Sequence, residues 1–289
     1  MSPRTLFASA KVNLHLHVVG RRDDGYHLLD SLVTFADVGD RLTVTPSDEL
    51  SLSVVGPFAG ALAHESENLV LRAAQELADR VGLTPTGHIE LEKNLPVASG
   101  IGGGSADAAA AMKLMMYHWQ IMPDPDDIKA VALRLGADVP VCLASRTIRM
   151  SGIGDVLDLT YPLPPIGMVL VNPGVPVSTA AIFKSLSGPF SGPAMEPHAP
   201  WKTAAEMVEA LEPTRNDLQA PACRLEPVIN DVLDAINGLP GCLMARMSGS
   251  GATCFGIFET PEAARGAAAG FSHPGWWIWG GPIRPHHPI

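Results

Sequence analysis

The stretch that decides the fold reads PVASGIGGGSADA and runs from Pro96 to Ala108. It holds four glycines and leads directly into an alanine-rich segment. Glycine lets the backbone take positive φ and approach a ligand closely, and the exposed N–H groups at the start of a helix attract an anion. The stretch therefore predicts a phosphate-binding loop for a nucleotide. The alternative is a flexible glycine turn in front of a helix.

Two familiar nucleotide-binding loops are excluded by the residues after the glycines. A P-loop NTPase would carry Lys-Ser or Lys-Thr there, and this chain carries Ser-Ala. The spacing Gly100-x-Gly102-x-x-Ser105 also lacks the third glycine of a dinucleotide fingerprint. The flanks favour a ligand loop over a plain turn, because residues 89–93 alternate like a strand and Ser105 is expected to cap a helix over residues 106–119.

Length and composition exclude several classes of protein. A chain of 289 residues is long enough for about two domains. Its 20 basic and 30 acidic residues give a net charge of −10 without any basic run, so neither nucleic acid nor an acidic membrane is an expected partner. No stretch reaches the length of an apolar membrane span, and the N-terminus has no secretory apolar core. We expect a soluble, cytoplasmic protein.

Cysteines and histidines give no metal signature. The four cysteines have neither metal-ligand spacing nor the density of a disulfide scaffold, so we expect reduced thiols. They are Cys142, Cys223, Cys242 and Cys254. No helical His-x-x-x-His accompanies His15-x-His17 or His286-His287, which favours a pair on a strand face and a solvated tail. No metal-ligating residues are predicted.

The first candidate catalytic face lies in an extended segment. Residues 10–19 alternate between apolar and polar side chains and predict a strand. The polar face carries Lys11, Asn13, His15 and His17. Alternation alone reports burial and not chemistry, so a half-buried strand with wet polar groups is the alternative. A turn at Asp24-Gly25 and a second extended segment over residues 28–44 come next in the chain.

Two helices are predicted by apolar spacing and by their ends. One is expected to have its first turn at residues 65–67, carries apolar residues spaced by four from Leu69 to Val81, and ends at Gly82. The other covers residues 126–135 and ends at Gly136, for which we expect a left-handed cap. Asp138 comes soon after, at a helix boundary, where capping is the common role of an aspartate.

The second half of the chain mixes helices and strands. Strands are predicted over residues 168–172, 242–247 and 253–258, and helices over residues 179–186, 204–211, 228–236 and 261–269. Residues 185–200 are rich in glycine and proline and predict a mobile surface loop. A second glycine cluster, Ser248 to Thr253, joins the last two strands, and taken alone it predicts a hairpin turn. Trp276, Trp277 and Trp279 are expected in the core.

Four motifs, in this order, resemble the GHMP kinase superfamily. They are Ala10–Leu14 with Gly25–His27, Leu95–Ala108, Leu135–Pro140 and Gly249–Ala252. The resemblance covers residues 8–258 and implies an α+β kinase of two domains. The first, over residues 1–160, would be of the ribosomal S5 domain 2 type, and the second, over residues 161–289, ferredoxin-like. The motif that contains Asp138 resembles the one found in a single branch of the superfamily. Members of that branch phosphorylate a cytidine-diphospho-polyol on a route to isoprenoids.

The resemblance also implies a role for individual residues. Lys11 and Asp138 match the catalytic pair, with Asp138 as the general base for an acceptor hydroxyl. Acceptor-binding positions are matched by Asn13, Tyr26, His27, Phe183, Gly249, Ser250 and Gly251, with cytosine held between Tyr26 and Phe183. ATP-binding positions are matched by Asn68, Lys93, Pro96, Val97, Ala98, Ser99, Gly100, Ile101, Gly102, Gly103, Gly104, Ser105 and Ala106.

The implied cofactors are ATP and Mg²⁺, and the implied assembly is a monomer or weak homodimer. The chain departs from the superfamily's commonest pattern at Ala106, where many relatives have a second serine, so one hydroxyl that could help to position Mg²⁺ is missing. Two alternatives stay open. One is a GHMP kinase acting on homoserine, mevalonate or a sugar, and the other is a nucleotide-binding regulator of the same fold without catalysis.

Overall fold

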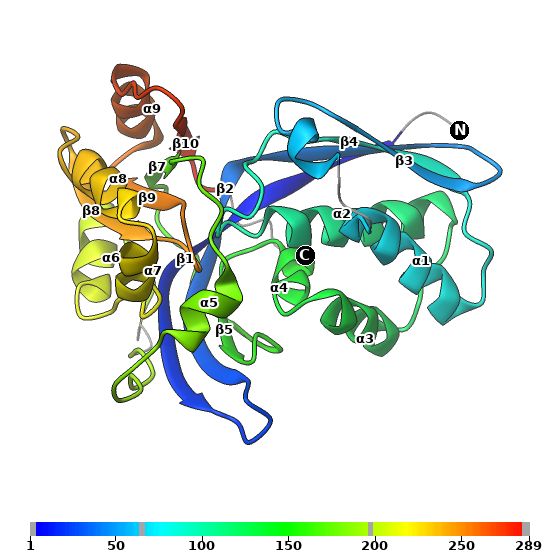
Figure 1. Ribbon diagram of the computed structural model, residues 1–289, viewed down its shortest axis with the longest axis horizontal. Helices are drawn as coiled ribbons and strands as arrows, with labels where there is room; N and C mark the ends of the chain where they lie inside the picture. The colour runs from blue at the N-terminus through cyan, green and yellow to red at the C-terminus, as the bar shows by residue number, and fades with distance from the viewer. Residues whose placement is uncertain (1–3, 64–66, 196–198, 285–289) are drawn as a thin grey trace. The chain divides into compact units, whose positions relative to one another are not determined.

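The computed structural model describes residues 4–63, 67–195 and 199–284. Its chain divides into two compact units. Unit 1 takes residues 1–10, 38–97 and 102–144, and unit 2 takes residues 11–37, 98–101 and 145–289. Neither unit is a continuous piece of chain, because β1 (Arg4–Arg21) and β2 (His27–Thr45), the long blue strands of Figure 1, each begin in one unit and end in the other.

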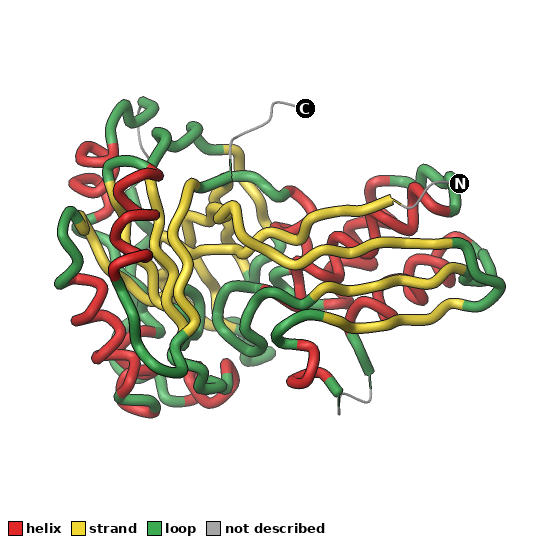
Figure 2. Tube along the Cα trace, turned by 90° about the horizontal axis from the view of Figure 1, so that it is seen from above, coloured by secondary structure: helices red, strands yellow, loops and turns green. Residues whose placement is uncertain are grey.

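Unit 1 is a sheet with helices on one face. Strand β4 (Gly87–Glu92) pairs in parallel with β3 (Leu50–Val55) and antiparallel with the second part of β2, and Figure 2 shows these strands side by side. In β4 the side chains of Ile89 and Leu91 are buried between exposed or half-buried neighbours, which is the alternation expected of a half-buried strand. The predicted strand at this place is confirmed.

Four helices pack together beside this sheet. They are α1 (Leu69–Val81), α2 (Gly103–His118), α3 (Pro125–Leu135) and α4 (Val139–Ala144), drawn below β3 and β4 in Figure 1. The end of α1 at Gly82 is as predicted, but the helix begins at Leu69 and not at the expected first turn; of residues 65–67 only Glu67 is described, and it precedes the helix. Asn68 caps its first turn by accepting a hydrogen bond from Val70 N, and Gly82 ends it in the left-handed conformation at φ 70°.

Two other helix ends differ from the prediction. Helix α2 begins at Gly103 with Gly102 as its N-cap, so Ser105 lies inside the first turn and does not cap it. Gly102 starts the helix from φ 64°, a conformation that glycine adopts without strain. Helix α3 ends at Gly136 with φ 159° and ψ 155°, which is not the left-handed helical conformation.

Unit 2 contains two groups of paired strands. The first part of β2 pairs with β5 (Ile148–Gly152), which pairs with β6 (Val156–Leu159). A four-stranded antiparallel sheet has the order β10-β7-β9-β8. Its strands are β7 (Gly167–Asn172), β8 (Cys242–Met247), β9 (Cys254–Phe258) and β10 (Trp277–Pro282). The second glycine cluster is the β8–β9 hairpin connection, as predicted.

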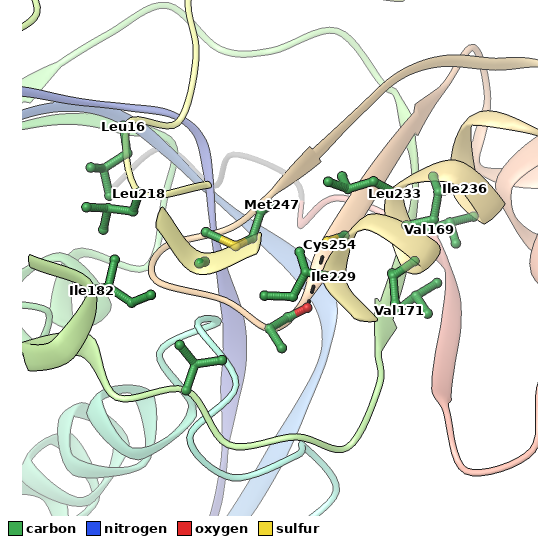
Figure 3. Packing of buried hydrophobic residues seen from close by; sticks show 14 of the residues in the cluster. Leu16, Val169, Val171, Ile182, Leu218, Ile229, Leu233, Ile236, Met247 and Cys254 are labelled. Atoms are coloured by element: carbon green, nitrogen blue, oxygen red, sulfur yellow. Dashed lines mark hydrogen bonds between the residues drawn. The ribbon is translucent and has the colours of Figure 1, made fainter. Parts of the chain in front are cut away.

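The helices of unit 2 pack against the four-stranded sheet or against one another. They are α5 (Thr179–Lys184), α6 (Ala204–Leu211), α7 (Gln219–Leu225), α8 (Val228–Asn237) and α9 (Pro261–Gly270). Ile229, Leu233 and Ile236 of α8 recur every three or four residues and pack near Val169 and Val171 of β7, as Figure 3 shows. Each such buried side chain contributes about 1.5–3 kcal/mol to folding.

The remaining elements lack a clear signal in the sequence. Strands β3, β5, β6 and β10, helices α4 and α7, and the short 3₁₀ turn Ala59–Leu62 were not predicted. Trp276, Trp277 and Trp279 are half-buried, and Trp276 packs against the core of unit 2, as expected. The predicted loop has no regular structure over residues 185–195 and 199–200, and residues 196–198 lie outside the described residues. Among the described residues, no helix is both long and apolar enough to cross a membrane.

Candidate active site

The predicted phosphate loop opens helix α2. Gly102 caps the helix without a side-chain hydrogen bond, and the first intrahelical bond runs from Ala106 N to Gly102 O. The first N–H groups of an α-helix have no acceptor inside the helix, and the helix dipole places partial positive charge there. A Cβ atom added at Gly104 would meet nothing within 4 Å, so the backbone here is open to a ligand. This loop fits a phosphate group.

The first half of the loop is held in unit 2 by backbone hydrogen bonds. Thr253 N donates to Ser99 O at 3.0 Å, and Lys11 N donates to Ile101 O at 2.9 Å. Between them, Ser248 Oγ donates to Gly100 O at 3.1 Å. The loop therefore lies against both β1 and the second glycine cluster. The motifs at Lys11, at the phosphate loop and at residues 248–253 are thus brought together in unit 2.

Two glycines make this close approach possible. A Cβ atom at Gly100 would lie 2.6 Å from both Ser248 O and Gly251 O. A Cβ atom at Gly249 would lie 2.6 Å from Gly100 O. Both residues also have positive φ, at 76° and 55°. Backbone packs directly on backbone here, which requires glycine on both sides.

The second half of the loop rests on a buried charge cluster in unit 1. Lys93 Nζ donates to Asp40 Oδ2 at 2.5 Å and to Asp107 Oδ2 at 2.7 Å, and the three side chains are at most 4% exposed. Asp40 Oδ1 also accepts from the backbone N of Asn94 and Leu95. Because Asp107 lies in the second turn of α2, this cluster anchors the start of that helix.

Burial governs the protonation of this cluster. Burial raises the pKa of Asp107 to about 8 against the attraction of Lys93, and the charge of Asp40 adds to the rise. Burial alone would lower the pKa of Lys93, but the two carboxylates outweigh it and raise that pKa. The sequence analysis placed Lys93 among the ATP-binding positions and did not select Asp40 or Asp107. In the structure the Lys93 ammonium points to these carboxylates.

The predicted catalytic face of β1 is buried. Lys11 is 3% exposed and Asn13 is fully buried, so the polar side chains are not wet. Asn13 N donates to Ser248 Oγ at 3.1 Å, and Asn13 Nδ2 donates to Ser31 Oγ at 2.8 Å. Asn13 Oδ1 is buried without a hydrogen-bond partner among the described residues. A buried amide oxygen of this kind can accept a hydrogen bond from a ligand hydroxyl.

Asp138 directly precedes α4 in unit 1. Its carbonyl accepts from Cys142 N at 3.1 Å, which closes the first turn of this six-residue helix. Lys11 belongs to unit 2, so the catalytic pairing of Lys11 with Asp138 stays a prediction.

A pocket of about 640 Å³ lies in unit 2 at the end of the β1–β2 hairpin. It is lined by Arg21, His27, Phe183, Lys184, Arg215 and Asp217, among others. The rings of His27 and Phe183 stack with centroids 4.9 Å apart, and Tyr26 beside them is 62% exposed. Burial, and then the charge of Arg21, lower the pKa of His27 and favour its neutral form. The pocket offers aromatic faces, a neutral imidazole and three cationic side chains.

The remaining predicted positions do not all lie at this pocket. Asn68 caps α1 in unit 1. Ser250 Oγ lies 2.8 Å from Thr179 Oγ1, at the start of α5, and Gly251 N donates to Ser248 O. The second glycine cluster thus contacts both the phosphate loop and the helix that carries Phe183.

The histidine pair on β1 is a strand-face pair, as expected. His15 and His17 are both buried, with ring centroids 5.2 Å apart. His286-His287 lies outside the described residues. In residues 4–63, 67–195 and 199–284, no group of three or more His, Cys, Asp or Glu side chains is arranged to hold a metal ion. The four cysteines are free thiols.

Two family models match the chain. GHMP kinases N terminal domain matches residues 68–146, and GHMP kinases C terminal matches residues 200–275. A 4-diphosphocytidyl-2-C-methyl-D-erythritol kinase of Paramagnetospirillum magneticum is 53% identical over 96% of this chain and 98% of its own length. The kinase of the same name from Granulibacter bethesdensis is 50% identical over 96% and 93%.

Solved structures agree with these matches. A crystal structure of 4-(cytidine 5'-diphospho)-2C-methyl-D-erythritol kinase has a TM-score of 0.74 and 34% identity, covering 97% of this chain and 99% of that one. A homoserine kinase from Cytophaga hutchinsonii has a TM-score of 0.68 and 19% identity over 98% and 95%. At that identity the second similarity supports the fold alone.

Proposed function

We propose that this chain, which belongs to the 4-diphosphocytidyl-2-C-methyl-D-erythritol kinases of the GHMP kinase family, transfers the γ-phosphoryl group of ATP to the 2-hydroxyl of 4-diphosphocytidyl-2-C-methyl-D-erythritol. The products are the 2-phosphate and ADP, on the methylerythritol phosphate route to isoprenoids. The observation that carries the proposal is the 53% identity to a kinase of this name over nearly the whole of both chains. The phosphate loop and the acceptor pocket supply the parts that such a reaction needs.

Nucleotide binding is assigned to the start of α2. The N–H groups from Gly102 to Ala106 would hold the phosphates, with Asn68, Lys93 and residues 96–101 as the further predicted ATP contacts. ATP with Mg²⁺ supplies the phosphoryl group and neutralises part of its charge in the transition state. A Cβ atom at Gly104 would meet nothing within 4 Å, which leaves space for a ligand beside this part of the loop.

Proton transfer is assigned to Asp138. A tertiary hydroxyl is a weak nucleophile until its proton is removed, and a carboxylate within hydrogen-bond reach can accept that proton. Lys11 is the predicted partner of Asp138, and its ammonium would stabilise the developing alkoxide. Asn13 Oδ1, buried without a partner among the described residues, orients an acceptor hydroxyl.

Acceptor recognition is assigned to the pocket at the β1–β2 hairpin. Phe183 and Tyr26 hold the cytosine ring, and His27 reads its edge by hydrogen bonds. Lys184, Arg21 and Arg215 line the same pocket and provide positive charge for a diphosphate. The predicted acceptor contacts are completed by Gly249, Ser250 and Gly251. Their segment contacts both the phosphate loop and α5, the helix that carries Phe183.

A domain boundary near residue 160 agrees with the two family matches. The N-terminal match ends at residue 146 and the C-terminal match begins at residue 200. We infer that the two sequence domains meet between these positions, at residues 160 and 161. The compact units divide the chain differently, because β1 crosses from one unit to the other.

The reaction is tested by following ADP release and phosphate transfer. The purified protein is incubated with ATP, Mg²⁺ and a set of acceptors: 4-diphosphocytidyl-2-C-methyl-D-erythritol, homoserine and mevalonate. Only the cytidine compound should gain a phosphate. Transfer to homoserine or mevalonate instead would identify another GHMP kinase, and nucleotide binding without any transfer would identify a regulator of the same fold.

The general base is tested by Asp138→Asn. This change removes proton acceptance but keeps the shape, so kcat should fall by roughly 10²-fold or more while both substrates still bind. Calorimetric affinities and the melting temperature are measured on the same preparation. Turnover at the wild-type rate would show that Asp138 is only a helix cap.

Cytosine stacking is tested by Phe183→Ala and Tyr26→Ala. Stacking of a base on an aromatic ring is worth about 1–3 kcal/mol, so the acceptor KM should rise by roughly 5- to 150-fold with ATP affinity unchanged. A lower melting temperature with unchanged acceptor KM would show that these rings only pack. Replacement of His27 should alter the preference between cytidine and uridine acceptors, because a base that leaves a polar group unpaired binds worse.

A further inference from the structure

The segment Arg215–Leu218 joins the acceptor pocket to the second glycine cluster within unit 2. Its backbone lies against β1: Leu16 N donates to Arg215 O at 3.0 Å, and Asp217 N donates to Leu16 O at 2.8 Å. This pairing sends the side chains of two successive residues, Asn216 and Asp217, to different partners. Neither residue was predicted to belong to the site.

Asn216 uses its whole amide to fix the second glycine cluster. Its Nδ2 donates to Met247 O and to Gly249 O, both at 2.8 Å, and its Oδ1 accepts from Leu218 N at 2.9 Å. The residue is 5% exposed. The two carbonyls that it binds flank Ser248 on either side. Asn216 therefore fixes the backbone on both sides of that serine.

Ser248 carries this constraint to the phosphate loop. Its hydroxyl donates to Gly100 O and accepts from Asn13 N, both at 3.1 Å. A displaced Ser248 would release both a loop carbonyl and the β1 backbone at the acceptor-binding Asn13. Asn216 is thus connected to the phosphate loop through a single residue, Ser248.

Asp217 fixes the wall of the acceptor pocket instead. Its Oδ2 accepts from Val18 N at 2.7 Å and from Ser191 Oγ at 2.6 Å, and its Oδ1 accepts from Arg215 Nε at 2.6 Å. Val18, Arg215 and Asp217 itself line the pocket. Burial alone would raise the pKa of Asp217, but these hydrogen bonds and the charge of Arg215 lower it, so the carboxylate stays ionised at neutral pH.

We propose that Asn216 and Asp217 are a pair of positioning residues with separate duties. Asn216 positions the Ser99–Ile101 half of the phosphate loop through Ser248, and Asp217 positions the pocket that receives the cytidine end of the acceptor. The assignment of the two pockets to nucleotide and acceptor rests on the proposed function. The pairing means that one short segment of chain sets the geometry at both substrates.

The test compares two isosteric variants by separate substrate affinities. Asn216→Asp replaces two N–H donors by an oxygen that faces two carbonyls, so the Kd for a non-hydrolysable ATP analogue should rise by about tenfold or more. The acceptor KM should rise by a clearly smaller factor, because Ser248 also holds Asn13 N and Asn216 also binds Gly249 O. Asp217→Asn should give the reverse pattern, with the acceptor KM raised about tenfold and the analogue Kd nearly unchanged.

Two matched control variants and the further variant Ser248→Ala help to interpret the measured affinities. Asn230→Asp and Asp231→Asn change the same residue types at exposed positions on α8 and should leave both affinities unchanged. Ser248→Ala removes the hydroxyl at the far end of the Asn216 connection and should weaken the ATP analogue in the same way. In the double variant the two losses should not add, because both break one connection.

Melting temperatures and calorimetry separate the results. If both variants weaken both ligands alike, or only lower the melting temperature, the proposal of separate duties is overturned. Additive losses of affinity for the ATP analogue in Asn216→Asp and Ser248→Ala would contradict the proposal that Asn216 acts through Ser248. Calorimetry with the ATP analogue needs no acceptor, so the Asn216 arm stands even if the wild-type protein fails to phosphorylate the cytidine compound.

Discussion

The two halves of the phosphate loop are held by different kinds of interaction. Ser99 to Ile101 are fixed in unit 2 by neutral hydrogen bonds and by glycine-to-backbone packing. The start of α2 is anchored in unit 1 by Lys93 between two buried carboxylates. Neutral contacts respond to shape and hardly to pH, whereas a buried charge cluster responds to both. One loop thus combines a part sensitive to added volume with a part sensitive to charge.

The largest effect is expected from Lys93→Met. The change leaves the buried Asp40 and Asp107 side chains without their cation, which should lower the free energy of unfolding by about 3–5 kcal/mol. Denaturant unfolding measures the loss. Lys129→Met, at an exposed position on α3, is the matched control and should change stability by less than about 0.5 kcal/mol. Adding Asp107→Asn to Lys93→Met should recover part of the loss, and no recovery would contradict the charge-based account.

A smaller loss is expected on the neutral side from Gly100→Ala. The new Cβ would lie 2.6 Å from two backbone oxygens at a residue with φ 76°, so the free energy of unfolding should fall by about 2–4 kcal/mol. Nucleotide affinity should fall as well, because the loop must move away from Ser248. Gly104→Ala, where a Cβ meets nothing within 4 Å, should leave stability unchanged. Equal losses of stability in Gly100→Ala and Gly104→Ala would contradict the proposed difference between the two halves of the phosphate loop.

The last effect is gradual: stability should depend on pH through Asp107. Its folded pKa of about 8 lies above the ordinary aspartate value of 3.8, so between these pH values the folded state holds a proton that the unfolded state has lost. Stability should therefore fall as pH rises through this window, by at most about 1.4 kcal/mol per pH unit. Asp107→Asn should remove that fall.

The difference between wild type and Asp107→Asn isolates this contribution. Burial lowers the pKa of His15 from 6.5 to about 4, against the attraction of Asp30, so stability supplied by its neutral form is lost as pH falls from about 6.5 to 4. That contribution has the opposite sign and is the same in both proteins. Unfolding curves at several pH values between 4 and 8 measure the difference, and parallel curves would contradict the assignment to Asp107.

The sequence predicts elements whose signals are local. Gly82 ends α1 as predicted, because a left-handed glycine acts within one turn, whereas the cap at Asn68 was not predicted. The start of α2 was missed by three residues, since Gly102 supplies by its backbone conformation what Ser105 was expected to supply by its side chain. Strand β5 was not predicted, because its pairing with the distant β2 decides it and local preference does not, and β6 in turn pairs with β5.

The residues of the candidate site were likewise predicted where their signal is local and missed where their role depends on distant partners. Lys11, Gly100 and Gly249 were singled out by motif, and the structure brings their segments together by close backbone contacts in unit 2. Asn216 and Asp40 stand in no motif that was recognised, and their importance comes from partners 31 or more residues away in the chain. Such a role depends on the folded neighbourhood, which a single sequence does not display.

The interleaving of the two units sets an order for synthesis on the ribosome. Every segment of unit 1 has been made once residue 144 is complete, whereas unit 2 must wait for β10, the edge strand at Trp277–Pro282. Domains made first generally fold first. The anchor of α2 on Lys93 therefore becomes available early, but Ser248 and Thr253, which hold Gly100 and Ser99, emerge more than a hundred residues later. During that interval the nascent chain carries half a phosphate loop, and its ability to hold a nucleotide arrives with the last strands.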